Sequence, residues 1–143
     1  MRFVDTNVLL YALGSTGRDE QKSAIARTLL GSADLALSTQ VLQEFYAQAT
    51  RVTRSGAIGH EQAMALVSSW LRFPVQEITV AIVQSALTAK RKFGLSYWDA
   101  AIVESARALG CRSVLTEDLN HGQAFDGVRV VNPFLSGISL GSF

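Results

Sequence analysis

Phe3-Val4-Asp5-Thr6-Asn7-Val8-Leu9-Leu10-Tyr11-Ala12 is the stretch of sequence that decides the fold. A short apolar run, three small polar residues and an apolar segment of helix length predict a strand, a turn and a helix. Asp5 then directly follows the strand, at the edge where an open parallel sheet binds its ligands. A carboxylate at that edge has to be hydrogen-bonded, paired with a cation or bound to a metal ion.

The rest of the chain continues this alternation of strands and helices. We expect strands over residues 3–4, 35–38, 74–78, 113–116 and 128–131, and helices over 8–13, 19–30, 39–53, 60–71, 80–93 and 96–109. The apolar stripe of the third helix extends to Val52, and residues 14–17 form a loop. This order predicts an α/β domain with a mostly parallel sheet, covering residues 1–134 and followed by a small, flexible tail over 135–143.

Composition restricts the class of protein. The 143 residues are 48% hydrophobic, which excludes a disordered chain. No apolar run reaches the roughly 18 residues that a membrane span needs. A secretory signal pattern is absent at the N-terminus, and the lone Cys111 cannot form an internal disulfide. We therefore expect a cytoplasmic protein without a membrane contact, in which Cys111 is a small buried residue next to a strand.

The net charge of +1 by itself argues against a polyanionic partner. The sum conceals a possible asymmetry, however. If four of the twelve acidic residues gather in one site, the thirteen basic residues outnumber the remaining acids by five. A basic surface around an acidic pocket would suit a ligand with a phosphate backbone.

Asp5 and Glu44 are the first two candidate site residues, and each has a plain structural alternative. Asp5 is also a good N-cap for the helix that follows it. Glu44, in Gln43-Glu44-Phe45, lies at the border of an apolar helix stripe and faces partly inward. Its alternative is a solvated position on the flank of the helix.

Asp99 and Asp118 complete the set. Ser96 and Asp99 have the spacing of a capping box, while Tyr97 and Trp98 either wall a site or belong to the core. Asp118 follows a buried strand, and its alternative is an ordinary turn aspartate. In an extended segment Thr116 and Asp118 point to the same side, and Glu117 points away.

Together the four acids carry more information than any one of them. Parallel topology brings strand ends and helix starts to one edge of the sheet, so we expect Asp5, Asp99 and Asp118 to meet there, joined by Glu44. Oxygen ligands without a His or Cys set favour Mg²⁺ or Mn²⁺. Such a site is typical of phosphoryl transfer by a metal-activated water.

At these residues the sequence resembles the PIN-domain ribonucleases, and within them the VapC toxins of bacterial toxin–antitoxin pairs. The matching motifs occur in the family's order and span almost the whole chain. They are Val4-Asp5-Thr6-Asn7-Val8-Leu9-Leu10-Tyr11, Gln43-Glu44-Phe45, Leu95-Ser96-Tyr97-Trp98-Asp99-Ala100-Ala101-Ile102, Leu115-Thr116-Glu117-Asp118-Leu119-Asn120-His121-Gly122-Gln123 and Gly127-Val128-Arg129-Val130-Val131-Asn132-Pro133-Phe134.

The resemblance implies a three-layer α/β/α domain that cleaves RNA with Mg²⁺, for which Mn²⁺ can substitute. The residues that it assigns are Asp5, Glu44, Asp99 and Asp118 as catalytic metal ligands, and Thr6, Asn7 and Thr116 as residues that orient the carboxylates or water. It also implies a homodimer and a cognate antitoxin whose C-terminal segment enters the active-site groove. His121 is expected to be structural rather than catalytic.

Two basic clusters have two possible roles each. Arg51 and Arg54 follow the Glu44 helix, and Lys90-Arg91-Lys92 ends the helix before Leu95. They either complement helix dipoles or contact RNA.

Two other functions share this length and these acids. One is a signalling domain that accepts a phosphoryl group on an Asp in an acidic Mg²⁺ pocket; this needs a late lysine, and no Lys follows Lys92. The other is a catalytically silent PIN fold that only binds RNA.

Overall fold

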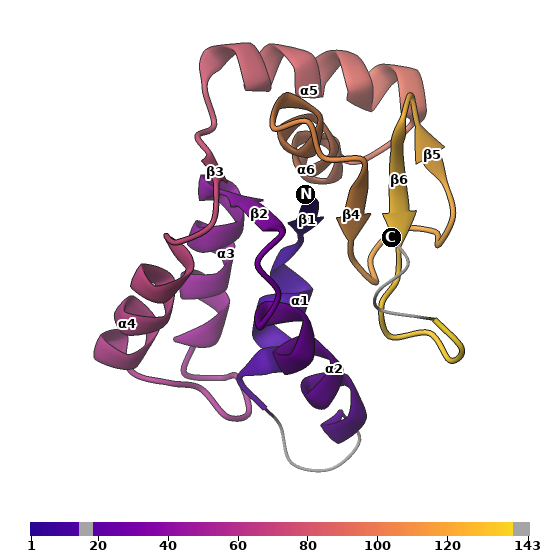
Figure 1. Ribbon diagram of the computed structural model, residues 1–143. Coiled ribbons are helices and arrows are strands. Elements are labelled where there is room, and N and C mark those ends of the chain that lie inside the picture. The colour runs from indigo at the N-terminus through magenta and orange to yellow at the C-terminus, as the bar shows by residue number, and fades with distance from the viewer. Residues whose placement is uncertain (15–18, 139–143) are drawn as a thin grey trace.

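The computed structural model describes residues 1–14 and 19–138, and Figure 1 shows how its helices and strands are arranged. Of the predicted loop over 14–17, residues 15–17 lie outside the described residues, as do residues 139–143 of the predicted tail. The helices are α1 (Thr6–Ala12), α2 (Glu20–Leu30), α3 (Thr39–Ala49), α4 (His60–Trp70), α5 (Val80–Phe93) and α6 (Tyr97–Ala108). The strands are β1 (Arg2–Val4), β2 (Leu35–Ser38), β3 (Val75–Gln76), β4 (Ser113–Leu115), β5 (Ala124–Phe125) and β6 (Val128–Val131).

The strands form one sheet in the order β3-β2-β1-β4-β6-β5. All neighbouring pairs are parallel except β5 and β6, which are antiparallel. In register, Phe3 of β1 lies between Ala36 of β2 and Val114 of β4. The carboxyl ends of β1 and β4 are therefore side by side, which brings the residues after each strand together.

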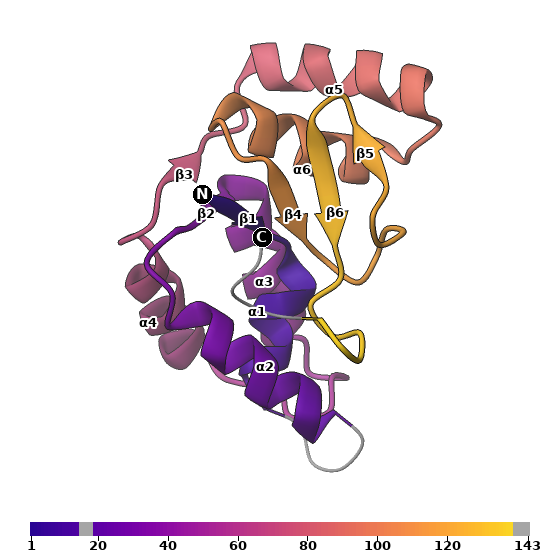
Figure 2. The same ribbon diagram turned by 45° about the vertical axis from the view of Figure 1, so that its right-hand side comes forward.

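Helices cover both faces of the sheet, and the predicted three-layer α/β/α architecture is confirmed. Figures 1 and 2 show α5 and α6 on one side of the sheet and α1 to α4 on the other. Connections from β1 to β2 and from β2 to β3 run outward in the same direction, whereas the connection from β3 to β4 returns across the sheet. Because such crossovers are right-handed, the returning helices have to lie on the opposite face.

The central strands of the sheet are buried on both faces, and this burial stabilises the core of the domain. Every residue of β1, β2 and β4 is buried, as expected for parallel strands between helical layers. On the α1–α4 side, Phe45 and Trp70 pack edge to face with ring centroids 4.7 Å apart. Cys111 is 3% exposed within this core, and burial raises the pKa of its thiol, which confirms it as a small buried residue.

Local capping signals fix both ends of α5 where the sequence predicts them. The Thr79 hydroxyl accepts a hydrogen bond from the Ile82 amide and begins α5. Gly94 ends α5 with φ of 68°, a left-handed conformation that costs glycine little. Helices α1, α2, α4 and α6 and strands β1 and β4 differ from the predicted bounds by one or two residues.

The prediction that α3 runs to Thr53 with Val52 in its apolar stripe is wrong. The helix ends at Ala49, Thr50 is its C-cap, and Val52 is 93% exposed. The Ile58 amide donates to the Ala49 carbonyl at 2.9 Å, so the chain turns back across the end of the helix and replaces its next turn.

Two larger differences from the prediction occur in the sheet. The predicted strand over 74–78 shortens to Val75–Gln76 at the sheet edge, next to Pro74, which has no amide hydrogen. Strand β5 was not predicted. It forms a hairpin with β6 through Asp126 and Gly127, whose φ values of 48° and 92° are both positive. An Asp-Gly pair before a β-branched run is the signal that could have revealed it.

The C-terminal segment returns to the first helix. Phe134 packs edge to face on Tyr11 of α1, with ring centroids 4.9 Å apart. In the described part of the chain, no helix combines the length and the apolar character that crossing a membrane requires.

Candidate active site

Asp5 stands where β1 ends and α1 begins, as an N-cap that also borders a cavity. It is the N-cap of α1, with one carboxylate oxygen accepting the Thr6 amide at 2.7 Å. The other oxygen accepts the Thr116 hydroxyl at 2.9 Å. The residue is only 5% exposed, yet it borders a cavity at the sheet edge, so its role as a cap does not remove it from the site.

The protonation of Asp5 reflects this burial. Removal from water raises the pKa of the carboxyl from 3.8 to about 7, and the negative charges of Asp118 and Glu44 add to the rise. Hydrogen bonds from Thr6 and Thr116 act in the opposite direction. Burial disfavours the ionised form of the Asp5 carboxyl. A cation bound beside it would therefore stabilise the ionised form and lower the pKa again.

Glu44 reaches the same place from α3. One oxygen accepts the Thr6 hydroxyl at 2.7 Å, and the other accepts the Gln40 side-chain amide at 2.9 Å. Gln40 is 6% exposed and also donates to the Trp98 carbonyl at 3.2 Å, so it ties α3 to the start of α6. The sequence prediction missed Gln40; its only signal is a position one helical turn before Glu44.

Asp99 lies in the first turn of α6, capped as the sequence predicts. The Ser96 hydroxyl accepts the Asp99 amide at 3.1 Å. Partial burial raises the pKa of the Asp99 carboxyl, and the charges of Asp118 and Glu44 raise it further. The same acids thus act on both Asp5 and Asp99, as expected for carboxylates around one space.

Thr116 and Asn7 hold the loop that carries Asp118. The Asn7 side-chain amide donates to the Thr116 hydroxyl at 2.9 Å and to the Asp118 carboxylate at 3.2 Å. The Asp118 backbone amide also donates to the Thr116 hydroxyl, at 3.0 Å. The completely buried Thr116 therefore joins Asp5, Asn7 and Asp118 through a single oxygen atom.

Glu117 points away from Asp118, in agreement with the alternation expected of an extended segment. Its carboxylate accepts the Tyr11 hydroxyl at 2.6 Å and the Lys22 ammonium at 2.9 Å. Burial and the bond to Glu117 raise the pKa of Tyr11. These contacts attach the loop to α1 and α2, next to the acidic site but outside it.

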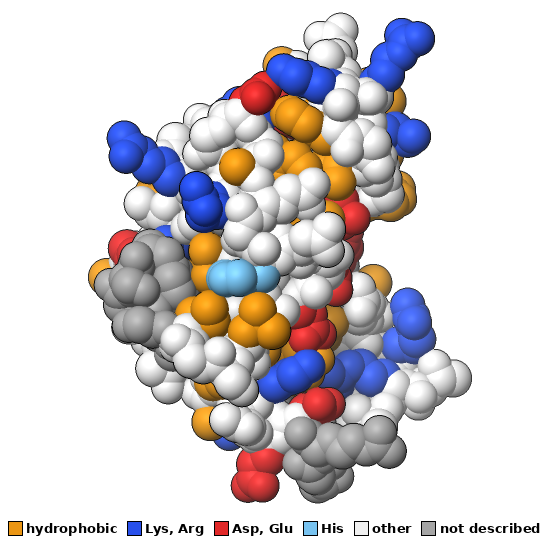
Figure 3. Space-filling view, turned by 90° about the vertical axis from the view of Figure 1, so that its right-hand side faces the viewer, with side chains coloured by type: hydrophobic (Ala, Val, Ile, Leu, Met, Phe, Trp, Pro, Cys, Tyr) orange, Lys and Arg blue, Asp and Glu red, His pale blue; other side chains and the backbone are white. Residues whose placement is uncertain are grey.

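All four acids line one cavity of about 210 Å³ at the edge where the parallel strands end. Figure 3 shows Asp and Glu side chains gathered along one edge of a face of the molecule, with Lys and Arg side chains beside them. The residues that line the cavity are Asp5, Thr6, Asn7, Leu10, Gln40, Glu44, Gln48, Trp98, Asp99, Ile102 and Asp118. Among these described lining residues there is no lysine, which a phosphoacceptor site would need.

The donor set suits Mg²⁺ or Mn²⁺ in kind, because it consists of carboxylate oxygens with hydroxyl and amide groups behind them. Within residues 1–14 and 19–138, however, no three Asp, Glu, His or Cys side chains already form a group that could hold one metal ion. Each of Asp5, Glu44 and Asp118 is hydrogen-bonded to a hydroxyl or an amide instead. A cation binding among them would have to draw the carboxylates together.

His121 and the residues of the two basic clusters do not line the acidic cavity. His121 accepts the Asn132 backbone amide at 3.0 Å, a structural contact that agrees with its expected role. Lys92 forms an exposed ion pair with Asp126 at 2.5 Å. Arg54 lines a second cavity of about 220 Å³, which shares Asn7 and Leu10 with the acidic cavity.

The chain resembles known proteins in family and in fold. A family model described as PIN domain matches residues 2–125 of the chain. A search of curated protein sequences finds no significant match.

Several solved structures share the fold. A toxin–antitoxin complex from Klebsiella pneumoniae aligns with a TM-score of 0.69 and 19% identity, over 94% of this chain and 98% of that one. VapC20 from Mycobacterium tuberculosis, described as a sarcin–ricin loop cleaving toxin, aligns with a TM-score of 0.63 and 24% identity, over 82% and 92%. DNA-bound VapBC from Salmonella typhimurium aligns with a TM-score of 0.62 and 18% identity, over 90% and 95%.

Proposed function

We propose, from the premise that the chain belongs to the PIN domain family, that this protein is a metal-dependent endoribonuclease and the toxin of a VapC-type toxin–antitoxin pair. Support comes from neighbours in fold that are described as toxin–antitoxin proteins, one of them as a toxin that cleaves the sarcin–ricin loop. The substrate would be RNA in the cytoplasm.

One observation carries the proposal: four carboxylates, from the junction of β1 and α1, from α3, from α6 and from the loop after β4, line a single cavity. Asp5, Glu44, Asp99 and Asp118 would hold the cation. When bound, Mg²⁺ or Mn²⁺ supplies Lewis-acid polarisation of a phosphodiester and a lowered pKa of a bound water.

The neighbouring side chains have positioning roles in this scheme. Thr6 and Gln40 each bond one oxygen of Glu44 and so fix its rotation. Thr116 and Asn7 fix Asp5 and Asp118 relative to each other. Such bonds hold the carboxylates in place before substrate arrives, which reduces the reorganisation that the reaction requires.

The proposed protein partners are a cognate antitoxin and a second copy of the chain. Neighbours in fold include toxin–antitoxin complexes from Klebsiella pneumoniae and Salmonella typhimurium. A cationic side chain of an antitoxin would relieve the repulsion among the acids and raise the free energy required for a metal ion to enter.

The test is cleavage of total cellular RNA by the purified protein, freed of any antitoxin, in Mg²⁺, in Mn²⁺ and in EDTA. We expect discrete fragments with 5′-phosphate ends that require the metal. The fragments should disappear with Asp99→Asn and persist with Glu61→Gln, which changes an exposed acid in the first turn of α4. Equal cleavage by Asp99→Asn and wild type would overturn the proposed site.

A further inference from the structure

Trp98 lines the acidic cavity but has no role in the proposed metal chemistry. It precedes Asp99 in the first turn of α6, lines the acidic cavity, and is 63% exposed. Leaving this much of an indole in water forgoes the large hydrophobic stabilisation that burial would provide. Of the two interpretations of Tyr97 and Trp98 considered above, the structure assigns Trp98 to the wall of the site.

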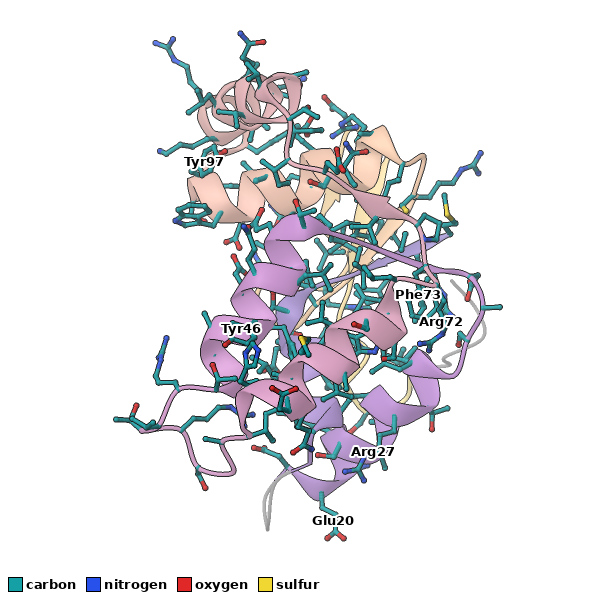
Figure 4. The ribbon with its side chains drawn as sticks, turned by 90° about the vertical axis from the view of Figure 1, so that its left-hand side faces the viewer. Glu20, Arg27, Tyr46, Arg72, Phe73 and Tyr97 are labelled. Carbon is teal, nitrogen blue, oxygen red and sulfur yellow. The ribbon has the colours of Figure 1, made fainter. Side chains whose placement is uncertain are left out.

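The indole is exposed but its attachment is fixed. The Trp98 carbonyl accepts a hydrogen bond from Gln40, the same amide that bonds Glu44. The Trp98 ring packs against Tyr97 with centroids 5.0 Å apart and planes at 79°. Tyr97 itself is half-buried against the core between α5 and α6, and Figure 4 shows it at the start of α6. The aromatic surface is therefore held in position without being covered.

The surroundings indicate which kind of molecule would cover it. The cavity joins Trp98 directly to four carboxylates. Across Asn7 and Leu10 it adjoins the second cavity, which Arg54 lines together with Asp19 and Glu117. An arginine, the acidic cavity and an exposed ring are therefore close neighbours on the surface. This combination suits a single strand of nucleic acid, whose phosphates pair with cations and whose bases stack on aromatic rings. An apolar segment of another protein would instead meet four carboxylates.

On this basis, and resting on the proposed function, we propose that Trp98 is a stacking platform for one unpaired nucleobase next to the cleaved phosphodiester. A base within a duplex is already stacked on its neighbours and cannot cover the ring. The substrate class is therefore an unpaired segment of RNA, such as a loop or a single strand.

The experiment measures binding apart from cleavage. In an Asp99→Asn background with Mg²⁺ present, the dissociation constant of a fluorescein-labelled, unstructured hexaribonucleotide is measured by fluorescence anisotropy with Trp98, Trp98→Phe or Trp98→Leu. Leu keeps apolar bulk but lacks a π-face, and Phe restores a flat ring. We expect Trp98→Leu to weaken binding by roughly 5- to 100-fold and Trp98→Phe to recover much of the loss. Leu87→Ala, which truncates an exposed leucine on α5 outside the cavity, should leave binding unchanged.

Hexamers with a single abasic position identify the stacked base. At one position, loss of the base should weaken binding to the Trp98 protein, and Trp98→Leu should then cause no further loss, as in a double-mutant cycle. Equal binding of the intact hexamer by the Trp98 protein and the Trp98→Leu variant, or additive losses at every abasic position, would overturn the stacking proposal. So would a change of oligomeric state in Trp98→Leu without a change in RNA affinity, because a second copy would then cover the ring.

Cleavage by the protein without the Asp99 substitution separates the two proposals. If that protein cleaves RNA while Trp98→Leu leaves every dissociation constant unchanged, only the stacking inference fails. If it neither cleaves nor binds the hexamer, the proposed ribonuclease function fails and takes the inference with it.

Discussion

The Thr116 hydroxyl donates a 2.9 Å hydrogen bond to the Asp5 carboxylate, joining residues that are 111 positions apart in the chain. Both follow parallel strands that are neighbours in the sheet. The same oxygen accepts hydrogen bonds from Asn7 and from the Asp118 amide. This one buried atom therefore sets the relative positions of two of the four acids.

Thr116→Val should lower both stability and cleavage. Valine has nearly the same shape but leaves Asp5, Asn7 and the Asp118 amide each without one partner. We expect the free energy of unfolding to fall by about 1–3 kcal/mol, measured by urea denaturation. Thr116→Ser keeps the hydroxyl and should recover most of this loss; a Ser variant as unstable as the Val variant would contradict the role of the hydroxyl.

Stability without metal should fall as the pH rises, because Asp5 has a raised pKa. The folded protein holds a proton on this carboxyl up to about pH 7, whereas the unfolded chain loses it near 3.8. The contribution of Asp5 to stability is thus complete below the lower value and is lost as the pH rises to the higher one. The two values imply a loss of up to about 4 kcal/mol.

Urea denaturation in EDTA across this pH range measures the effect of Asp5. Asp5→Asn removes the titrating group, so the pH dependence of its free energy of unfolding should be flatter than that of wild type. Parallel curves for the two proteins would show that Asp5 ionises in the folded protein as easily as in the unfolded chain.

Magnesium should stabilise the protein more at alkaline than at acidic pH. Binding a cation requires the ionised carboxylates, so metal binding competes with protons on Asp5 and Asp99. We expect the rise in melting temperature caused by Mg²⁺ to increase as the pH passes about 7. In Asp99→Asn the rise should be much smaller at every pH. A rise that is independent of pH would place the ion elsewhere.

Gln40→Met should reduce cleavage without a comparable loss of stability. Methionine fills the same space but cannot donate to Glu44 or to the Trp98 carbonyl. Losing a residue that orients a metal ligand typically lowers activity by about 10–100-fold. Gln43→Met, on the exposed side of the same helix, is the matched control and should cleave RNA at the wild-type rate.

Gly127→Ala should destabilise the β5–β6 hairpin. Gly127 has φ of 92°, which an alanine adopts only with strain, although the space beside it is open. We expect a loss of about 1–2 kcal/mol in the free energy of unfolding. Asp126→Gly relieves the positive φ of the neighbouring residue and should cost less. Equal stability of Gly127→Ala and wild type would show that the turn can change its conformation.

Much of the fold could be predicted because the relevant interactions are local. The helix that starts after Thr79 and ends at Gly94 is specified by a hydroxyl cap, an apolar periodicity and a glycine within the segment itself. The end of α3 could not be predicted in this way. Its sequence continues in a helical pattern to Val52, and only the return of Ile58 onto Ala49 stops it.

By itself the sequence determined that Asp5, Asp99 and Asp118 stand at ends of elements and that these elements alternate between strand and helix, because both follow from periodicity and capping within a few residues. Only the tertiary structure decided that Glu44 bonds Thr6, that Gln40 joins the site, and that Trp98 stays exposed beside it. The two hydrogen bonds join residues tens of positions apart in the chain. Like the exposure of Trp98, they depend on how the helices pack on the sheet, which no local pattern specifies.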